Sequence, residues 1–210
     1  MSNYSEYDFD QSETIHYHSY LAPTVMKAIP PSQQPGRVVD LGCGDGSLLA
    51  SFEKQGWKSY GVDLSESGIA AARRKFPGIE FHCKGFDDAL VRELGAAQFD
   101  LVISTEVVEH LYAPRELPRI AFQLLKPGGL MVVSTPYHGY LKNCALALSG
   151  NFDRHFSALW DCGHIKFWSY KTLQALLREA GFTSFHFFGS GRVPFLWKSM
   201  VVSAQKPSLR

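Results

Sequence analysis

The sequence predicts an α/β fold: a doubly wound sheet of about seven strands, mostly parallel, with helices on both faces. Two observations carry this prediction. Short apolar runs alternate with helical patterns, as in βαβ units, and two final apolar runs can close the sheet as an antiparallel hairpin. The length of 210 residues suits one sizeable domain, so we expect 1–210 to be a single unit.

The elements follow from apolar periodicity and from the Pro and Gly residues that end it. The expected strands are 37–41, 59–63, 80–84, 99–104, 130–135, 183–188 and 200–205. The expected helices are 13–29, 46–54, 66–76, 106–111, 114–124 and 169–180. Residues 126–129 (Lys-Pro-Gly-Gly) read as a turn, and 136–168 as the longest irregular stretch.

The composition is ordinary for a globular protein, and the net charge is +1. That charge gives no electrostatic argument for nucleic acid or an anionic membrane as partner. The four cysteines form no C-x-x-C pair, which favours reduced thiols. The polar, acidic start does not resemble a signal peptide, and no apolar stretch approaches the roughly 18 residues that span a bilayer. We therefore expect a cytoplasmic protein.

A glycine-rich turn follows the first expected strand. Gly42, Gly44 and Gly46 stand where the chain turns tightly and its backbone must approach a ligand. Asp63 ends the next strand, 21 positions after Gly42, where an acid can accept hydrogen bonds from ribose hydroxyls. The strand, turn, helix and acid together predict a nucleotide-type ligand at the carboxyl ends of the strands.

The spacing of this turn distinguishes between ligands. Dinucleotide sites carry G-x-G-x-x-G with a helix N-terminus facing a pyrophosphate, whereas this turn is G-x-G-x-G. Asp40 precedes the turn and Asp45 lies inside it; their carboxylates would repel a pyrophosphate and suit a cationic sulfonium and amino group. The simpler alternative is that the glycines only form a tight strand–helix turn.

Four segments resemble the motifs of class I S-adenosylmethionine-dependent methyltransferases with a Rossmann-like sheet. They are 40–46 (Asp-Leu-Gly-Cys-Gly-Asp-Gly), 61–65 (Gly-Val-Asp-Leu-Ser), 99–110 and 125–130. Within that class the sequence looks most like the ubiquinone-biosynthesis O-methyltransferase group (methyltransferase types 11 and 23). The resemblance covers 36–135, the expected cofactor-binding core.

The resemblance implies a set of contacts with S-adenosylmethionine. The methionine part would lie over Asp40, Gly42 and Gly44, with Asp63 on the ribose. The remaining implied contacts are Leu64 flanking the adenine, Phe86 and Asp87 near its edge, and Thr105 from the fourth strand. For Leu64 and Phe86, plain core packing is an equal alternative.

The segment after the fourth strand carries Glu106, Glu109 and His110. At this spacing they share one face of the helix expected there, where they can bind a divalent cation such as Mg²⁺ or act as a general base. The motif is similar to the metal site of small-RNA 2′-O-methyltransferases, which implies His164 as a fourth ligand. His110 and His164 are also the candidate catalytic residues. Alternatively, acids in a first helical turn are favoured by the helix dipole alone.

The outer segments are expected to hold the acceptor. We expect 136–168, rich in aromatic and histidine residues, to be an acceptor lid, and 13–30, with Tyr17 and His18, to be a helix over the cofactor. Residues 169–207 would supply the last helix and the closing strands, and the loop 189–197 with Arg192 can line the acceptor pocket or be an ordinary hairpin loop. Segment 141–148 could touch a membrane peripherally, although packing on its own domain is the favoured alternative.

The sequence leaves three functions open. The favoured one is methyl transfer to a small-molecule acceptor, by O-methylation of a phenolic or quinone-like hydroxyl, in a monomer or homodimer. The second is a metal-dependent RNA 2′-O-methyltransferase, against which the near-neutral charge counts. The third is a nucleotide-binding protein that transfers no methyl group.

Overall fold

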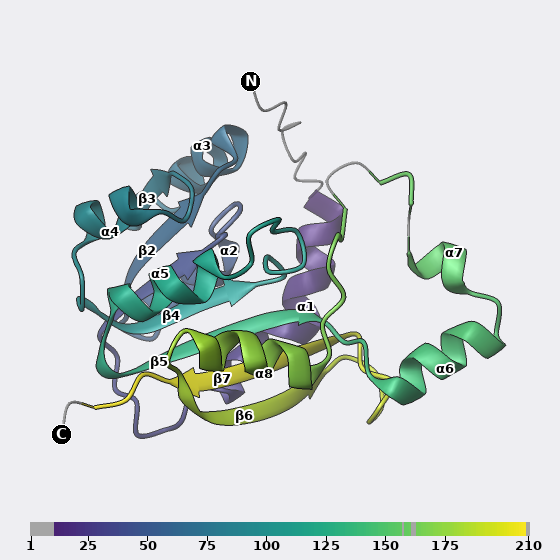
Figure 1. The fold of residues 1–210 in the computed structure, drawn as a ribbon. Helices are drawn as coiled ribbons and strands as arrows, with labels where there is room; N and C mark the ends of the chain where they lie inside the picture. Colours follow the sequence, from purple (N-terminus) through teal and green to yellow (C-terminus); the bar gives the residue numbers. More distant parts are fainter. Residues whose placement is uncertain (1–10, 157, 161–162, 209–210) are drawn as a thin grey trace.

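The computed structural model describes residues 11–156, 158–160 and 163–208, and their side chains from residue 19 onward. One seven-stranded sheet, in the order β3-β2-β1-β4-β5-β7-β6, forms its centre (Figure 1). The strands are β1 (Arg37–Leu41), β2 (Lys58–Asp63), β3 (Glu80–Cys83), β4 (Phe99–Thr105), β5 (Leu125–Pro136), β6 (Thr183–Ser190) and β7 (Ser199–Gln205). β7 runs antiparallel to both of its neighbours, and the other pairs are parallel. The predicted fold class is therefore confirmed.

Helices cover both faces of this sheet. They are α1 (Gln11–Lys27), α2 (Ser47–Glu53), α3 (Glu66–Lys75), α4 (Asp88–Leu94), α5 (Glu116–Leu124), α6 (Tyr140–Leu148), α7 (Phe152–His155) and α8 (Tyr170–Glu179). One buried cluster joins one face to α4, α5 and α8, and a second joins the opposite face to α1, α2 and α3. Burial of these two apolar layers is the main stabilising term of the fold.

Short polar side chains fix where several helices begin. Ser65 accepts a hydrogen bond from the backbone N–H of Gly68 at the start of α3, and Asp87 accepts one from Leu90 at the start of α4. Ser169 and Thr172 form a reciprocal capping box at the start of α8. Helix α4 was missed in the sequence, although the Asp87 cap and Gly95 at its end were available signals.

Two local predictions are wrong. Residues 106–111 are not a helix: Glu106 has a left-handed φ of 55°, and a turn bond from His110 N–H to the Val107 carbonyl follows. The turn expected at 126–129 lies within β5, where the pairing with β4 shifts register between Phe99 and Leu101.

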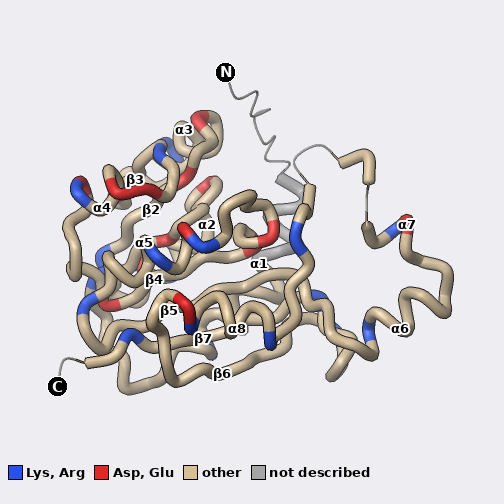
Figure 2. The backbone as a smooth tube through the Cα atoms, viewed as in Figure 1, with Lys and Arg blue, Asp and Glu red and all other residues tan. Residues whose placement is uncertain are grey.

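The segment 136–168 is more ordered than its sequence indicates. It contains α6 and α7, which stand away from the sheet beyond the end of β5 (Figure 1). None of the helices in the described ranges is long and apolar enough to cross a bilayer. Basic and acidic residues are interspersed along the described helices and strands (Figure 2), which matches the near-neutral net charge.

Candidate cofactor and acceptor site

The glycine turn sits at the carboxyl end of β1 and is tied to β2. The backbone N–H groups of Gly42 and Cys43 both donate to the carbonyl of Val62, at 2.8 and 3.0 Å. Gly42, Gly44 and Gly46 have φ values of 91°, 52° and 76°, which side chains other than glycine rarely adopt. A Cβ on Gly42 would also collide with the side chain of Val107. The turn therefore requires glycine for conformation and for close approach.

Asp63 joins this turn to the end of β2. One carboxylate oxygen accepts the backbone N–H of Gly44 and the other that of Ser65, each at 2.8 Å. Each oxygen keeps a second lone pair, which can accept a hydroxyl. Burial raises the pKa of Asp63, and these backbone hydrogen bonds act against that effect. These hydrogen bonds fix Asp63 beside the glycine turn, and its role as the ribose-binding acid stays a prediction.

Asp40 and Asp45 differ in role. Asp40 is buried, its Oδ1 has no hydrogen-bond partner among the described residues, and burial and the charge of Asp63 raise its pKa. Asp45 instead accepts from Ser47 N–H and pairs with Lys75 Nζ at 2.6 Å. Burial would raise the pKa of Asp45, but these hydrogen bonds lower it. Of the two carboxylates expected to face a cationic ligand group, Asp45 is already paired with Lys75, and only Asp40 keeps an oxygen without a partner among the described residues.

The other expected cofactor contacts lie at neighbouring strand ends. Leu64, directly after β2, has 61% of its surface exposed, which suits an apolar ligand face. Phe86 packs against the core cluster beneath α4 and α5, in agreement with the packing alternative. Asp87 caps α4, and Thr105 ends β4 opposite Ser134 of β5.

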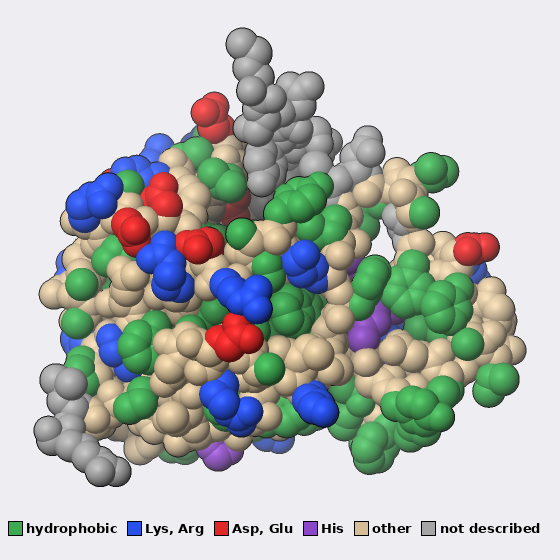
Figure 3. All heavy atoms as spheres, viewed as in Figure 1, with side chains coloured by type: hydrophobic (Ala, Val, Ile, Leu, Met, Phe, Trp, Pro, Cys, Tyr) green, Lys and Arg blue, Asp and Glu red, His purple; other side chains and the backbone are tan. Residues whose placement is uncertain are grey.

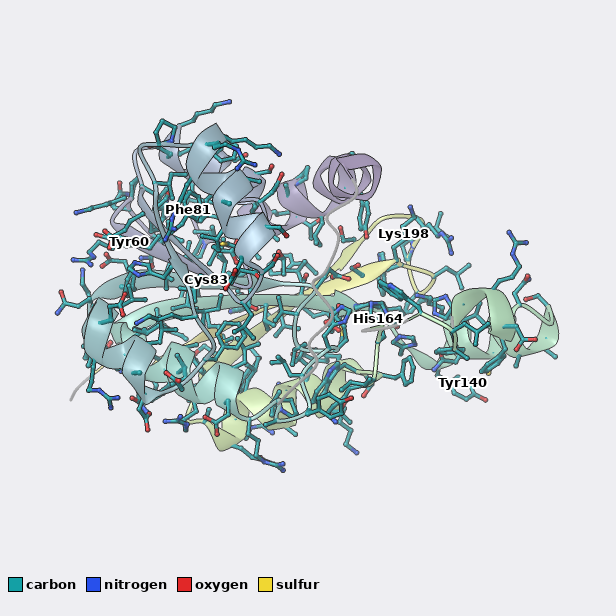
Figure 4. The ribbon with its side chains drawn as sticks, turned by 90° about the horizontal axis from the view of Figure 1, so that it is seen from above. Tyr60, Phe81, Cys83, Tyr140, His164 and Lys198 are labelled. Carbon is teal, nitrogen blue, oxygen red and sulfur yellow. The ribbon has the colours of Figure 1, made fainter. Side chains whose placement is uncertain are left out.

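A carboxylate and two imidazoles meet beyond the end of β4. The ligand atoms of Glu109, His110 and His164 all lie within 4.8 Å of one another. The backbone carbonyl of Glu109 accepts from Ile165 and Lys166, at 3.0 Å each, and so ties the returning lid segment to the turn after β4. Figure 4 shows His164 between the sheet and α6. The fold thus brings these three predicted residues together, although the whole lid separates His164 from the other two in sequence.

The polar atoms of this cluster are poorly satisfied. Glu109 is fully buried, and neither of its carboxylate oxygens has a hydrogen bond within the described residues; His164 Nε2 is likewise unpaired by a hydrogen bond and lies 4.0 Å from Glu109 Oε1. Burial, and then the charge of Glu106, raise the pKa of Glu109; its own backbone N–H and the nearby Thr135 hydroxyl act in the opposite direction without a well-formed hydrogen bond. Burial lowers the pKa of His164 to about 4, so its imidazole is neutral. A neutral imidazole can accept a proton or ligate a cation.

Glu106 does not belong to this cluster. Its Oε1 accepts a hydrogen bond of 2.8 Å from the Ser134 hydroxyl, and burial raises its pKa to about 7. The helical spacing that grouped Glu106 with Glu109 and His110 is absent, because the chain turns at Glu106. Glu106 therefore faces β5, and the geometry groups three of the four predicted metal ligands.

Two residues at this end of the sheet, Tyr20 and Lys142, were not among the predicted site residues. The Tyr20 hydroxyl, from α1, lies 3.4 Å from Ser199 Oγ of β7, and burial raises the pKa of Tyr20 to about 12. Lys142 of α6 is buried. No short motif marks either one, because their partners come from distant segments. The predicted Tyr17 and His18 lie outside the residues whose side chains the structure describes.

Segment 136–168, the predicted acceptor lid, has a small aromatic core of its own. His138 stacks on Phe156, with ring centroids 5.7 Å apart, and meets Phe167 edge-on at 5.1 Å. Burial, followed by the charge of Lys142, lowers the pKa of His138 to about 4. These contacts join the start, middle and end of 136–168 into one packed unit.

This sheet, with its glycine turn and paired acid, defines a Rossmann-like methyltransferase fold. The family model described as "Methyltransferase domain" matches residues 14–186, and the chain belongs to that family. The predicted family is thus confirmed.

Individual relatives agree with this assignment. A "Ubiquinone biosynthesis O-methyltransferase" of a Caulobacter species is 40% identical over 119 residues, covering 54% of this chain and 46% of that protein. The chain spans about half the length of the curated relatives it matches.

Solved structures show the same fold. An S-adenosylmethionine-dependent methyltransferase from Mesorhizobium loti superposes with a TM-score of 0.65 at 24% identity, covering 87% of this chain and 96% of that one. Phosphoethanolamine N-methyltransferase 2 of Haemonchus contortus, solved with S-adenosyl-L-methionine, superposes with a TM-score of 0.68 at 17% identity. The match covers 89% of this chain and 52% of that one.

Proposed function

We propose that this protein transfers the methyl group of S-adenosylmethionine to a hydroxyl of a phenolic or quinone-like small molecule. The observation that carries the proposal is the adjacency of two sites. The glycine turn and Asp63 stand at the ends of β1 and β2, and the Glu109–His110–His164 cluster stands beyond β4, the strand next to β1. A methyl donor and a proton acceptor would therefore meet at one edge of the sheet.

The chemistry divides between these two places. Methyl transfer is an in-line displacement in which the cofactor supplies reactivity and the protein supplies alignment. The attacking hydroxyl must lose its proton, and the candidate to take it is His164, whose Nε2 lies 4.0 Å from the Glu109 carboxylate that would stabilise the protonated imidazole. The name of the 40% identical relative supports a hydroxyl as the acceptor group.

The two other functions suggested by the sequence are less well supported. Membership of the methyltransferase family argues against a nucleotide-binding protein without transfer. The interspersed charges in Figure 2 do not resemble the basic stripe that RNA binding favours.

A divalent cation such as Mg²⁺ is a second candidate at the acid–histidine cluster. Glu109 offers two buried oxygens without hydrogen bonds, and His164 offers one such nitrogen; with His110 they form a mixed carboxylate–imidazole donor set, which suits a transition-metal cation better than Mg²⁺. Glu109, His110 and His164 would hold the cation, which would lower the pKa of a bound hydroxyl. Titrating the protein with Mg²⁺, Mn²⁺ and Zn²⁺ by calorimetry tests this. Binding of one of these ions that Glu109→Gln abolishes is expected; no heat of binding with any of the three would remove the cation.

The main proposal is tested in two steps. Calorimetry should show binding of S-adenosylhomocysteine, and a radiolabelled methyl-transfer assay with catechol and hydroquinone acceptors should give a methyl ether. Failure to bind S-adenosylhomocysteine, or transfer to amines in place of hydroxyls, would refute the proposal.

A further inference from the structure

Helix α6 of the lid buries a charged side chain and exposes apolar ones. Its buried residue is a lysine, Lys142, whereas Tyr140, Leu141 and Leu148 of the same helix are exposed. Green apolar side chains accordingly gather on the outer surface of this part of the molecule (Figure 3). Burying an ammonium group is costly unless it is paired, so an inward-facing lysine needs an explanation.

The surroundings of Lys142 do not supply a matching anion. Its Nζ donates one long hydrogen bond, of 3.4 Å, to the carbonyl of Lys198, and no carboxylate of the described residues lies within ion-pair distance. Burial lowers the pKa of Lys142 to about 8, with a further lowering by the charge of Arg192; the charge of Glu106, which forms no ion pair with Lys142, acts in the opposite direction. His138 and His155 also face this group, and both have lowered pKa values, so they add no charge near neutral pH.

A second positive charge, that of Arg192 in the hairpin between β6 and β7, acts on Lys142, although the Arg192 side chain itself is exposed. Arg192 has a left-handed φ of 62°, and the preceding Gly191 one of 64°. The charge of Arg192 acts on both Lys142 and His155, and Arg192 has no ion pair in the part of the chain that the structure describes. Figure 4 shows Lys198, at the end of this hairpin, on the side of the sheet that faces α6.

We propose that Lys142, together with Arg192, binds a carboxylate group carried by the methyl acceptor. This inference rests on the proposed function and specifies its substrate class: an aromatic hydroxy acid in preference to a neutral phenol. The geometric basis is Lys142 itself: a buried ammonium with one long hydrogen bond and no ion pair among the described residues is a group that an anion would stabilise. Glu106, whose charge acts on Lys142, would stay bound to the Ser134 hydroxyl.

The test compares two acceptors that differ in this group. We would measure kcat/KM for 3,4-dihydroxybenzoate and for 4-methylcatechol with the wild type, Lys142→Met, Lys142→Arg and the control Lys54→Met. Lys54 is an exposed lysine that follows α2, away from the lid. Binding of both compounds to protein saturated with S-adenosylhomocysteine would be measured by calorimetry, so that affinity is known even without turnover.

We expect the wild type to prefer the carboxylate compound by about 10- to 100-fold, a typical effect of a desolvated charge-assisted contact. Lys142→Met should reduce this preference to less than about threefold, Lys142→Arg should restore part of it, and Lys54→Met should leave it unchanged. Unchanged binding of S-adenosylhomocysteine shows that each variant is folded.

Other results separate this inference from the proposed function. A wild type that binds both compounds equally, or a Lys142→Met variant that keeps the preference, would overturn the carboxylate site while O-methylation stands. Selective, Lys142-dependent binding of the carboxylate compound without methyl transfer would support the site and refute the proposed function.

Discussion

The two halves of the site are built in different ways. In the cofactor half, the turn after β1 and the acid after β2 satisfy each other through backbone hydrogen bonds, with Asp63 accepting from Gly44 and Ser65. In the acceptor half, Tyr20, Glu109, Lys142 and His164 come from four separate segments, and buried oxygens and nitrogens of Glu109 and His164 lack hydrogen bonds within the described residues.

The cofactor half is therefore preformed, whereas the acceptor half contains polar atoms that only a ligand would satisfy. A buried polar atom without a partner costs free energy, so the acceptor half is arranged for a group that would satisfy it. The cofactor half leaves mainly Asp40 unsatisfied among the described residues, as expected where a cationic ligand group would sit. Variants in the two halves should therefore separate cofactor binding from turnover.

The largest expected effect is on the glycine turn. Gly42→Ala should weaken S-adenosylhomocysteine binding at least about 100-fold, because the new Cβ collides with Val107 and the left-handed φ of 91° is strained. Calorimetry measures this loss. Gly56→Ala is the matched control: its φ is 88°, but a Cβ there has its nearest neighbour at 3.9 Å. Normal binding by a folded Gly42→Ala variant would contradict a close approach at this turn.

The next effect concerns the acceptor half. His164→Gln should lower the rate of methyl transfer about 100-fold, the usual scale for loss of an acid–base group, while S-adenosylhomocysteine affinity stays within about threefold. Radiolabel transfer measures the rate of methyl transfer, and calorimetry measures the affinity for S-adenosylhomocysteine. The exposed His186 of β6 provides the control variant His186→Gln, which should change neither. An equal loss of affinity and rate would show that the two halves are not separable.

The cofactor half was predictable from sequence because its requirements are local. A turn that needs left-handed φ needs glycine, and an acid that follows the next strand lies beside it in a parallel sheet. The mostly parallel sheet and the closing hairpin followed from the same alternation of patterns. Helix α4 was missed although the cap residue Asp87 and Gly95 mark its two ends; the equally short α2 was predicted because it directly follows the glycine turn.

The acceptor half was predicted only in part. His164 joined Glu109 and His110 as the resemblance implied, but Glu106 did not, because one left-handed residue ends the helical spacing. Lys142 could not be identified, since its neighbours Arg192 and Lys198 are about 50 residues away in sequence and no motif connects them.

A smaller effect is expected for the acid that holds the turn. Asp63→Asn keeps the size of the side chain but replaces one accepting oxygen by an N–H group that faces a backbone donor. S-adenosylhomocysteine binding should weaken about 10-fold, or about 1.4 kcal/mol. Asp87→Asn, which alters the side chain that caps α4, should weaken it less. The reverse order of the two losses would argue against Asp63 as the ribose-binding acid.

The smallest effect tests whether Asp45 is structural. Lys75→Met should lower the free energy of unfolding by less than about 1 kcal/mol, because 43% of the Lys75 side chain is exposed to solvent. The pKa of Asp45 is lowered from its ordinary value of 3.8, so the pair stabilises the fold above that pH and loses its effect as the pH falls through the lower folded value. Urea unfolding should therefore show a difference between wild type and Lys75→Met at pH 7 that shrinks below about pH 4. S-adenosylhomocysteine binding at pH 7 should be unchanged in the variant. A clear loss of affinity would show that Asp45 takes part in cofactor binding.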